Sequence, residues 1–91
     1  MKCARERKSE GMPRFLIHHR HAAPECGVVF ASFKGHDSPL RHRPTPSSCH
    51  YGDHTIWWCV DATSENEALA LLPTYVARRA TATPVRDVEI P

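Results

Sequence analysis

Residues 54–61, HTIWWCVD, form the segment that most restricts how this 91-residue chain can fold. Side chains of an extended strand alternate between two faces. Ile56, Trp58 and Val60 share one face, and Trp57 lies with Cys59 on the other. Because both faces carry large apolar groups, both must be covered for the strand to be stable. The segment therefore predicts a central strand with a packed layer on each side.

Three further segments before it have the patterns of regular structure. Residues 14–21 alternate as a strand, and a helix is expected to begin near Pro24 and to end at Gly35. Residues 36–46 are rich in proline and predict a loop. Residues 47–51 are then expected to form a strand that pairs with 54–61 across a tight turn at Gly52 and Asp53.

The C-terminal part predicts one helix and one strand. Ser64 and Glu67 form a capping box at the start of ENEALALL, and Pro73 ends or kinks that helix. Residues 77–85 alternate as a last strand. The order βαββαβ predicts an α+β, ferredoxin-like fold: a four-stranded antiparallel sheet with two helices on one face.

The polar segment 1–11 predicts a disordered tail, and residues 12–91 a single domain; Met12 is an alternative translation start. The formal net charge is +2 and the basic residues are scattered, which argues against nucleic acid as a partner. No stretch is apolar and long enough for a membrane span, and no secretory signal is recognisable. A cytoplasmic protein that does not bind membranes is expected.

Residues 52–91 resemble the C-terminal half of muconolactone isomerases, which belong to the dimeric α+β barrel group. The resemblance rests on four segments: TIWWCVDA, SENEAL, LLPTY and TPVRDVEIP. The same half is similar, more loosely, to small nickel-binding ferredoxin-like proteins, whose equivalent strand has a pair like Trp58 and Cys59. The resemblance implies a homodimer in which the open sheet faces of two subunits pack together. It supplies no catalytic residue, because the HHRH strand of the first half does not match.

The stretch His18-His19-Arg20-His21 predicts a metal site. His19 and His21 leave the same face of a strand about 6.5–7 Å apart, so both imidazoles can meet one ion. Cys26 follows near the start of the first helix. We expect these three to ligate nickel, zinc or copper, with His50, His54 or Cys59 as a fourth ligand. The alternative is that the histidines occupy a solvated strand end and Cys26 is a buried apolar residue.

A catalytic interpretation of the same residues also stays open. A thiol at a helix start beside an imidazole can act as a nucleophile, which would pair Cys26 with His19 or His21. Glu25 or His18 would then transfer the proton. No fingerprint of an organic cofactor is present.

A ligand pocket is predicted from His18, Arg20, Trp57 and Trp58, and it would accept an aromatic or lactone-like molecule. Which face of the first strand is buried cannot be decided from the alternation. The sequence favours a small dimeric binding protein that holds a transition metal or a small ligand near the first strand and first helix. An isomerase-like enzyme acting on an unsaturated lactone or aromatic catabolite is the alternative.

Overall fold

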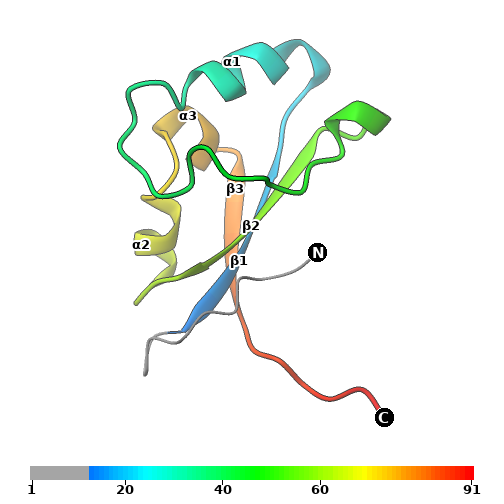
Figure 1. Cartoon of the computed structure of the whole chain (residues 1–91), viewed down its shortest axis with the longest axis vertical. Coiled ribbons are helices and arrows are strands. Elements are labelled where there is room, and N and C mark those ends of the chain that lie inside the picture. The colour runs from blue at the N-terminus through cyan, green and yellow to red at the C-terminus, as the bar shows by residue number, and fades with distance from the viewer. Residues whose placement is uncertain (1–12) are drawn as a thin grey trace.

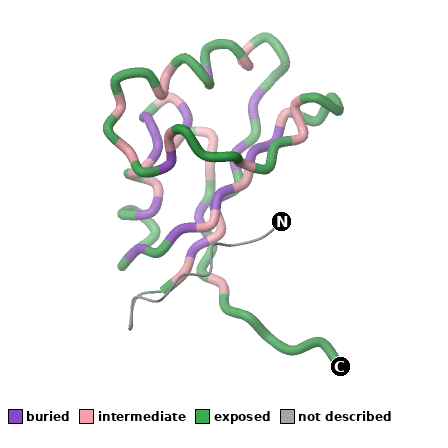
Figure 2. Tube along the Cα trace, viewed as in Figure 1, coloured by how far each residue is buried: buried purple, intermediate pink, exposed green. Residues whose placement is uncertain are grey.

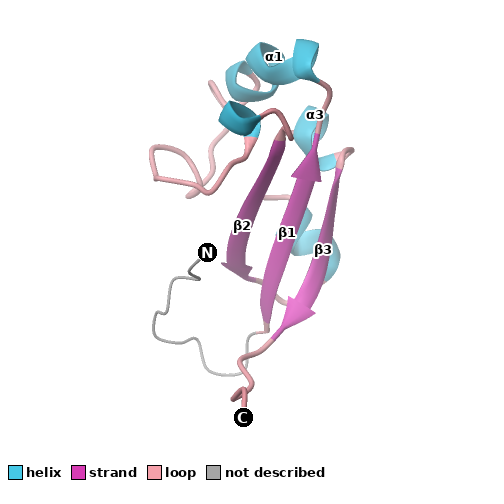
Figure 3. Cartoon of the chain, turned by 90° about the vertical axis from the view of Figure 1, so that its right-hand side faces the viewer, coloured by secondary structure: helices cyan, strands magenta, loops and turns pink. Residues whose placement is uncertain are grey.

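The computed structural model describes residues 13–91, so the predicted tail 1–11 and Met12 lie outside the described residues. A three-stranded antiparallel sheet forms the centre of the molecule, in the order β2-β1-β3 (Figure 3). β1 is Arg14–Arg20, β2 is Thr55–Asp61 and β3 is Ala80–Val85. The predicted first strand and the strand 54–61 are therefore both present, but the first of them is the central one.

The helices are short and lie on one side and at one end of the sheet (Figure 1). α2 (Glu65–Leu69) and α3 (Thr74–Ala77) cover one face. α1 (Cys26–Ala31) lies across the end at which β1 finishes and β2 begins (Figure 3). Two 3-10 turns complete the elements: η1, Ala23–Glu25, and η2, Cys49–Tyr51. None of the described helices has the length and apolar character that crossing a membrane requires.

The core lies between the sheet and the helices. On β1 and just after it, Phe15, Ile17, His19 and His21 are all buried, which decides the question of which face of this strand points inward. β2 contributes Ile56, Trp58 and Val60 to the same layer, as its alternation predicts. Buried segments consequently follow the strands, whereas the C-terminal residues after β3 are exposed along their length (Figure 2).

The prediction of a four-stranded ferredoxin-like sheet is wrong, because residues 47–51 do not form a strand. Only Ser47 bridges to β2, at Ile56. The carbonyl of Ser48 accepts hydrogen bonds from the backbone N–H groups of Tyr51 and Asp53 (2.9 and 3.3 Å). These local bonds wind the segment into η2 and take the place of a ladder. The order is therefore βαβααβ, which is not that of the predicted dimeric α+β barrel.

The second predicted helix is also divided. The Ser64 hydroxyl accepts from the N–H of Glu67 at 3.1 Å, so the predicted Ser64 cap is confirmed, whereas the Glu67 carboxylate accepts from the N–H and hydroxyl of Thr63 and not from the Ser64 N–H of a capping box. α2 nevertheless ends at Leu69, and Pro73 then starts the separate helix α3. Because α3 occupies the residues up to Ala77, the last strand begins at Ala80 and not at 77 as predicted.

Candidate metal centre

The antiparallel pairing of β1 and β2 brings two distant segments to one end of the sheet. Arg20, the last residue of β1, pairs with Thr55, the first of β2. His21 follows β1 directly and His54 precedes β2 directly, and the N–H of His21 donates to the carbonyl of His54 at 3.1 Å. The two histidine side chains therefore start from adjacent points at the α1 end of the sheet.

Each histidine is accompanied by a cysteine on its own short loop. Four residues separate His21 from Cys26 in the first ligand loop, residues 21–26. Four residues also separate Cys49 from His54 in the second ligand loop, residues 49–54. η1 leads into Cys26 and η2 begins at Cys49, so both loops turn tightly enough to return their ends to the same place.

The four side chains form one compact group of possible ligands. Cys26 Sγ lies 3.2 Å from His21 Nε2 and 3.1 Å from His54 Nδ1. Cys49 Sγ lies 3.5 Å from His21 Nε2, and all four ligand atoms lie within 4.8 Å of one another. A tetrahedral site with Zn–N and Zn–S distances of about 2.0–2.3 Å has edges of about 3.3–3.8 Å. The group could therefore hold a metal ion with small side-chain movements.

His19 does not belong to this group but orients one of its members. A carbonyl only accepts hydrogen bonds, so His19 Nδ1–H donates to the carbonyl of Val76 in α3 at 3.0 Å. His19 Nε2 is then an acceptor, and His21 Nδ1–H donates to it at 3.0 Å. This leaves the lone pair of His21 Nε2 directed at the two sulfur atoms. Ligating histidines in metal sites are held by a second hydrogen bond of this kind.

Glu25 fixes the first ligand loop. One carboxylate oxygen accepts from the N–H of Ala22 at 2.9 Å. The other accepts from the Tyr75 hydroxyl at 2.6 Å and from Arg79 Nε at 3.1 Å. The hydrogen bond from Tyr75, then that from Ala22 and the charge of Arg79, lower the pKa of Glu25 to about 2. The residue directly before Cys26 is thus tied to α3 and to the chain that follows it.

Asp53 fixes the second ligand loop in a similar way. Its Oδ2 accepts from the hydroxyls of Thr55 (2.9 Å) and Ser48 (3.1 Å), which lie at the two ends of the loop. These bonds, that of Thr55 first, lower the pKa of Asp53. His54 has a positive φ of 53°, a conformation that is uncommon outside glycine and that the structure must hold in place. The loop is therefore built to present Cys49 and His54 in one orientation.

The electrostatics of the group oppose the nucleophilic interpretation of Cys26. Burial, followed by the hydrogen bond with Cys49, raises the pKa of the Cys26 thiol. Burial also lowers the pKa values of His19 and His21. A catalytic thiolate needs the opposite shift, and Glu25, ion-paired and ionised over most of the pH range, is unsuited to donate a proton. A divalent cation instead favours ionised thiols and neutral imidazoles together.

The structure places the other predicted ligands away from the group. His50 lies on η2 and is exposed, with its ring against that of Tyr51. Cys59 pairs with Leu16 and lies four residues further along β2 than Thr55, which is the strand residue next to His54. Of the three residues predicted as the main ligands, His21 and Cys26 belong to the group, whereas His19 contacts it only through its hydrogen bond with His21. His54 was one of three alternatives for the fourth ligand.

Cys49 was missed as a candidate ligand, although the sequence carries a signal for it. The order His-x4-Cys at residues 21–26 is mirrored by Cys-x4-His at residues 49–54. Interpreting residues 47–51 as a strand concealed this symmetry, because the tight-turn register pairs Cys49 with Ile56 and His54 with Tyr51, and so treats Cys49 as a member of a ladder and not as the start of a loop. The mirrored spacing is the pattern that could have identified all four residues.

The four residues of the predicted ligand pocket do not share one face. Trp58 faces the helices, whereas His18, Arg20 and Trp57 lie on the open face, the side of the sheet away from the helices. There the ring of His18 meets that of Trp57 edge-on, with 6.1 Å between centroids. Trp58 therefore lies on the opposite side of the sheet from the other three residues of the predicted pocket.

Comparison of the chain with models of known protein families, with curated proteins and with solved structures finds no match. The resemblance of residues 52–91 to muconolactone isomerases and nickel-binding proteins consequently stays a prediction. The candidate metal centre stands on its own geometry.

Proposed function

We propose that this protein is a small metal-binding domain that holds one zinc ion through His21, Cys26, Cys49 and His54. The observation that carries the proposal is the convergence of four ligand atoms within 4.8 Å from two separate loops. Hydrogen bonds between the thiols and the imidazoles hold the four side chains at this spacing without an ion. The same spacing is the arrangement that a shared cation stabilises.

The donor set favours zinc over the other metals considered. Two sulfur and two nitrogen atoms in a tetrahedral arrangement are typical of zinc. Nickel(II) and copper(II) prefer square-planar or tetragonal sets of nitrogen and oxygen. Nickel and copper are therefore less suitable here than zinc, although the same four residues would be their ligands.

Four protein ligands complete the coordination of zinc, which supports a structural role for the ion. Catalytic zinc sites keep one position open for water or substrate. Here His21 is buried and the other three side chains are half-buried, so the ion would be enclosed by the two ligand loops. Zinc would tie the end of β1 and the start of α1 to η2 and β2, and its binding free energy would add to the stability of the fold.

The first experiment is elemental analysis of protein purified without chelator, followed by thermal unfolding with and without added chelator. We expect one zinc ion per chain and a clear fall in the melting temperature when zinc is removed. Cys49→Ser and His54→Ala should each lose stoichiometric zinc.

His50→Ala is the matched control, because His50 lies between Cys49 and His54 in the chain but outside the ligand group. It should retain one zinc ion per chain. A wild-type protein that takes up no zinc when the ion is supplied, or a Cys49→Ser variant that binds zinc as well as the wild type, would refute the proposed function.

A further inference from the structure

A pocket separate from the metal centre lies between α1, β2 and the proline-rich loop. Its volume is about 420 Å³, a size typical of small-molecule sites. None of the four metal-ligand residues lines it. Its walls combine two chemical types: apolar side chains at the base, and basic side chains from the segment after α1 and from the proline-rich loop. The pocket is therefore an independent feature of the fold.

The base of the pocket is apolar and largely aromatic. Ile56 and Trp58 of β2 are buried beneath it, and Phe33 packs against Trp58 with ring centroids 6.1 Å apart. Phe30 of α1 forms one edge and is 53% exposed, an unusual position for a large apolar ring. A flat ring entering the pocket would meet aromatic surfaces at its base and at this edge.

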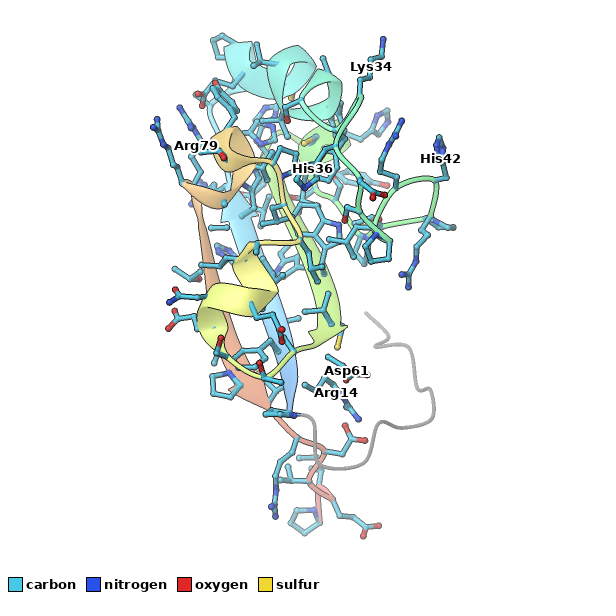
Figure 4. All side chains as sticks on the ribbon, turned by 90° about the vertical axis from the view of Figure 1, so that its left-hand side faces the viewer. Arg14, Lys34, His36, His42, Asp61 and Arg79 are labelled. Atoms are coloured by element: carbon cyan, nitrogen blue, oxygen red, sulfur yellow. The ribbon has the colours of Figure 1, made fainter. Side chains whose placement is uncertain are left out.

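The rim of the pocket is positively charged. Lys34, Arg41, His42 and Arg43 line it, and no carboxylate among the described residues does. Lys34 and His42 extend outward on the same side of the molecule (Figure 4). The ion pairs found in residues 13–91 use Arg14, Arg20 and Arg79, so the pocket's own arginines and lysine have no carboxylate partner there. Such a rim attracts an anion.

The loop that carries Arg41 and Arg43 is held in a defined shape. Leu40 is buried, and its N–H donates to the Ser38 hydroxyl at 3.1 Å. Arg43 Nη1 donates to the carbonyl of Pro39 at 3.3 Å. His42 between them has a φ of 61°, a conformation that costs free energy in a non-glycine residue. The pocket is thus preformed, which lowers the entropy lost when a ligand binds.

We propose that this pocket binds an aromatic carboxylate. The ring would lie against Phe30, Phe33 and Trp58, and the carboxylate would be held by Arg41 and Arg43 at the rim. The guanidinium group matches a carboxylate with two parallel hydrogen bonds, which distinguishes it from a neutral group of the same shape.

Isothermal titration of the isolated protein with 2-naphthoate, and with the uncharged 2-naphthamide, tests this assignment. The wild type should bind naphthoate saturably and about tenfold or more tightly than naphthamide. The double variant Arg41→Gln/Arg43→Gln should lose this preference. Phe30→Ser should weaken both ligands to a similar degree, because it removes ring contact and no charge.

Arg86→Gln is the matched control, since Arg86 lies in the exposed C-terminal segment and does not line the pocket. It should leave both affinities unchanged. Absence of saturable naphthoate binding to the wild type would overturn the proposal, as would equal binding of acid and amide. Because the ligand group of the metal is untouched in all these variants, their zinc content reports separately on the proposed function.

Discussion

His19 is fully buried, yet its role is to hold His21 and not to ligate. Two hydrogen bonds use both of its ring nitrogens and connect the candidate metal centre to the backbone of α3. This chain of bonds determines which nitrogen of His21 carries the proton. Removal of a partner that orients a ligating histidine commonly weakens metal affinity by about 10- to 100-fold.

We therefore expect His19→Phe to bind zinc in the same stoichiometry as the wild type but about 10- to 100-fold more weakly. Competition with a chromophoric chelator measures the dissociation constant. His18→Phe, on the open face one residue earlier, is the control and should bind zinc normally. Equal affinities of the His19→Phe and wild-type proteins would show that His19 does not position the ligand.

Glu25 should contribute to stability in a pH-dependent way. Its pKa in the folded protein is about 2, below the value of 4.5 for an unperturbed carboxyl. Since the folded state favours the ionised form, the carboxylate stabilises the fold fully above pH 4.5. That contribution is lost as the pH falls from 4.5 toward 2.

Glu25→Gln should accordingly lower the free energy of unfolding at pH 7, and its difference from the wild type should shrink between pH 4.5 and 2. Urea unfolding of zinc-free protein across this range measures the difference without a contribution from acid-induced release of zinc. Glu89→Gln in the exposed C-terminal segment should show no such trend. A pH-independent difference for Glu25→Gln would contradict the assignment.

At the scale of the elements, replacing glycine by alanine at Gly27 and at Gly52 should have opposite effects on stability. A Cβ at Gly27 in α1 or at Gly52 after η2 would meet nothing within 4 Å, so packing is the same for both. Gly52 has a φ of 91°, which side chains other than that of glycine rarely adopt, whereas Gly27 is helical. The backbone conformation alone should then decide whether alanine raises or lowers the free energy of unfolding.

We expect Gly27→Ala to stabilise the protein by about 0.5–1 kcal/mol, because alanine favours a helix. Gly52→Ala should destabilise it by about 1–2 kcal/mol, because it strains the turn between Cys49 and His54. Thermal unfolding of the two variants side by side measures both. Stabilisation by Gly52→Ala would mean that η2 does not keep this conformation in solution.

Strands and helix ends were predictable from the sequence where a few neighbouring residues determine them. Alternation in residues 14–21 and 54–61, the Ser64 cap and the stop at Pro73 each depend on a few neighbouring residues. The second ligand loop was not predictable in this way. Whether Ser48 and Asp53 bond to one another or allow a ladder depends on how residues 36–47 approach β2, which is a property of the packed molecule.

At the scale of the whole molecule, the open face of the sheet bears on self-association. Leu16 and Trp57 are half-buried there beside the exposed His18. At the outer edge of β2, the N–H of Trp57 already donates to the carbonyl of Pro46 at 3.1 Å. At the other edge of the sheet, β3 contains Pro84, which has no N–H with which to extend a ladder. If two copies associate, the faces and not the edges are suited to meet.

The homodimer is a prediction that sedimentation of the purified protein can test. We expect a dimer for the wild type and a monomer for Trp57→Arg, because a charge on the open face would be desolvated in the contact. Tyr51→Arg is a control, since Tyr51 is 84% exposed on η2, outside the face. A monomeric wild type, or a Trp57→Arg variant that remains dimeric, would contradict this mode of association.

The amino-acid sequence by itself determined the layered α+β character, the aromatic strand at residues 54–61 and the choice of His21 and Cys26 as candidate ligands, although that strand lies at an edge of the sheet and not at its centre. Each depends on alternation or on spacing within one segment. Only the tertiary structure decided that the sheet has three strands, and that Cys49 and His54 join His21 and Cys26. The physical reason is that 22 residues separate the two cysteines. Their approach is set by the register between β1 and β2 and by the turn of η2, not by any local preference.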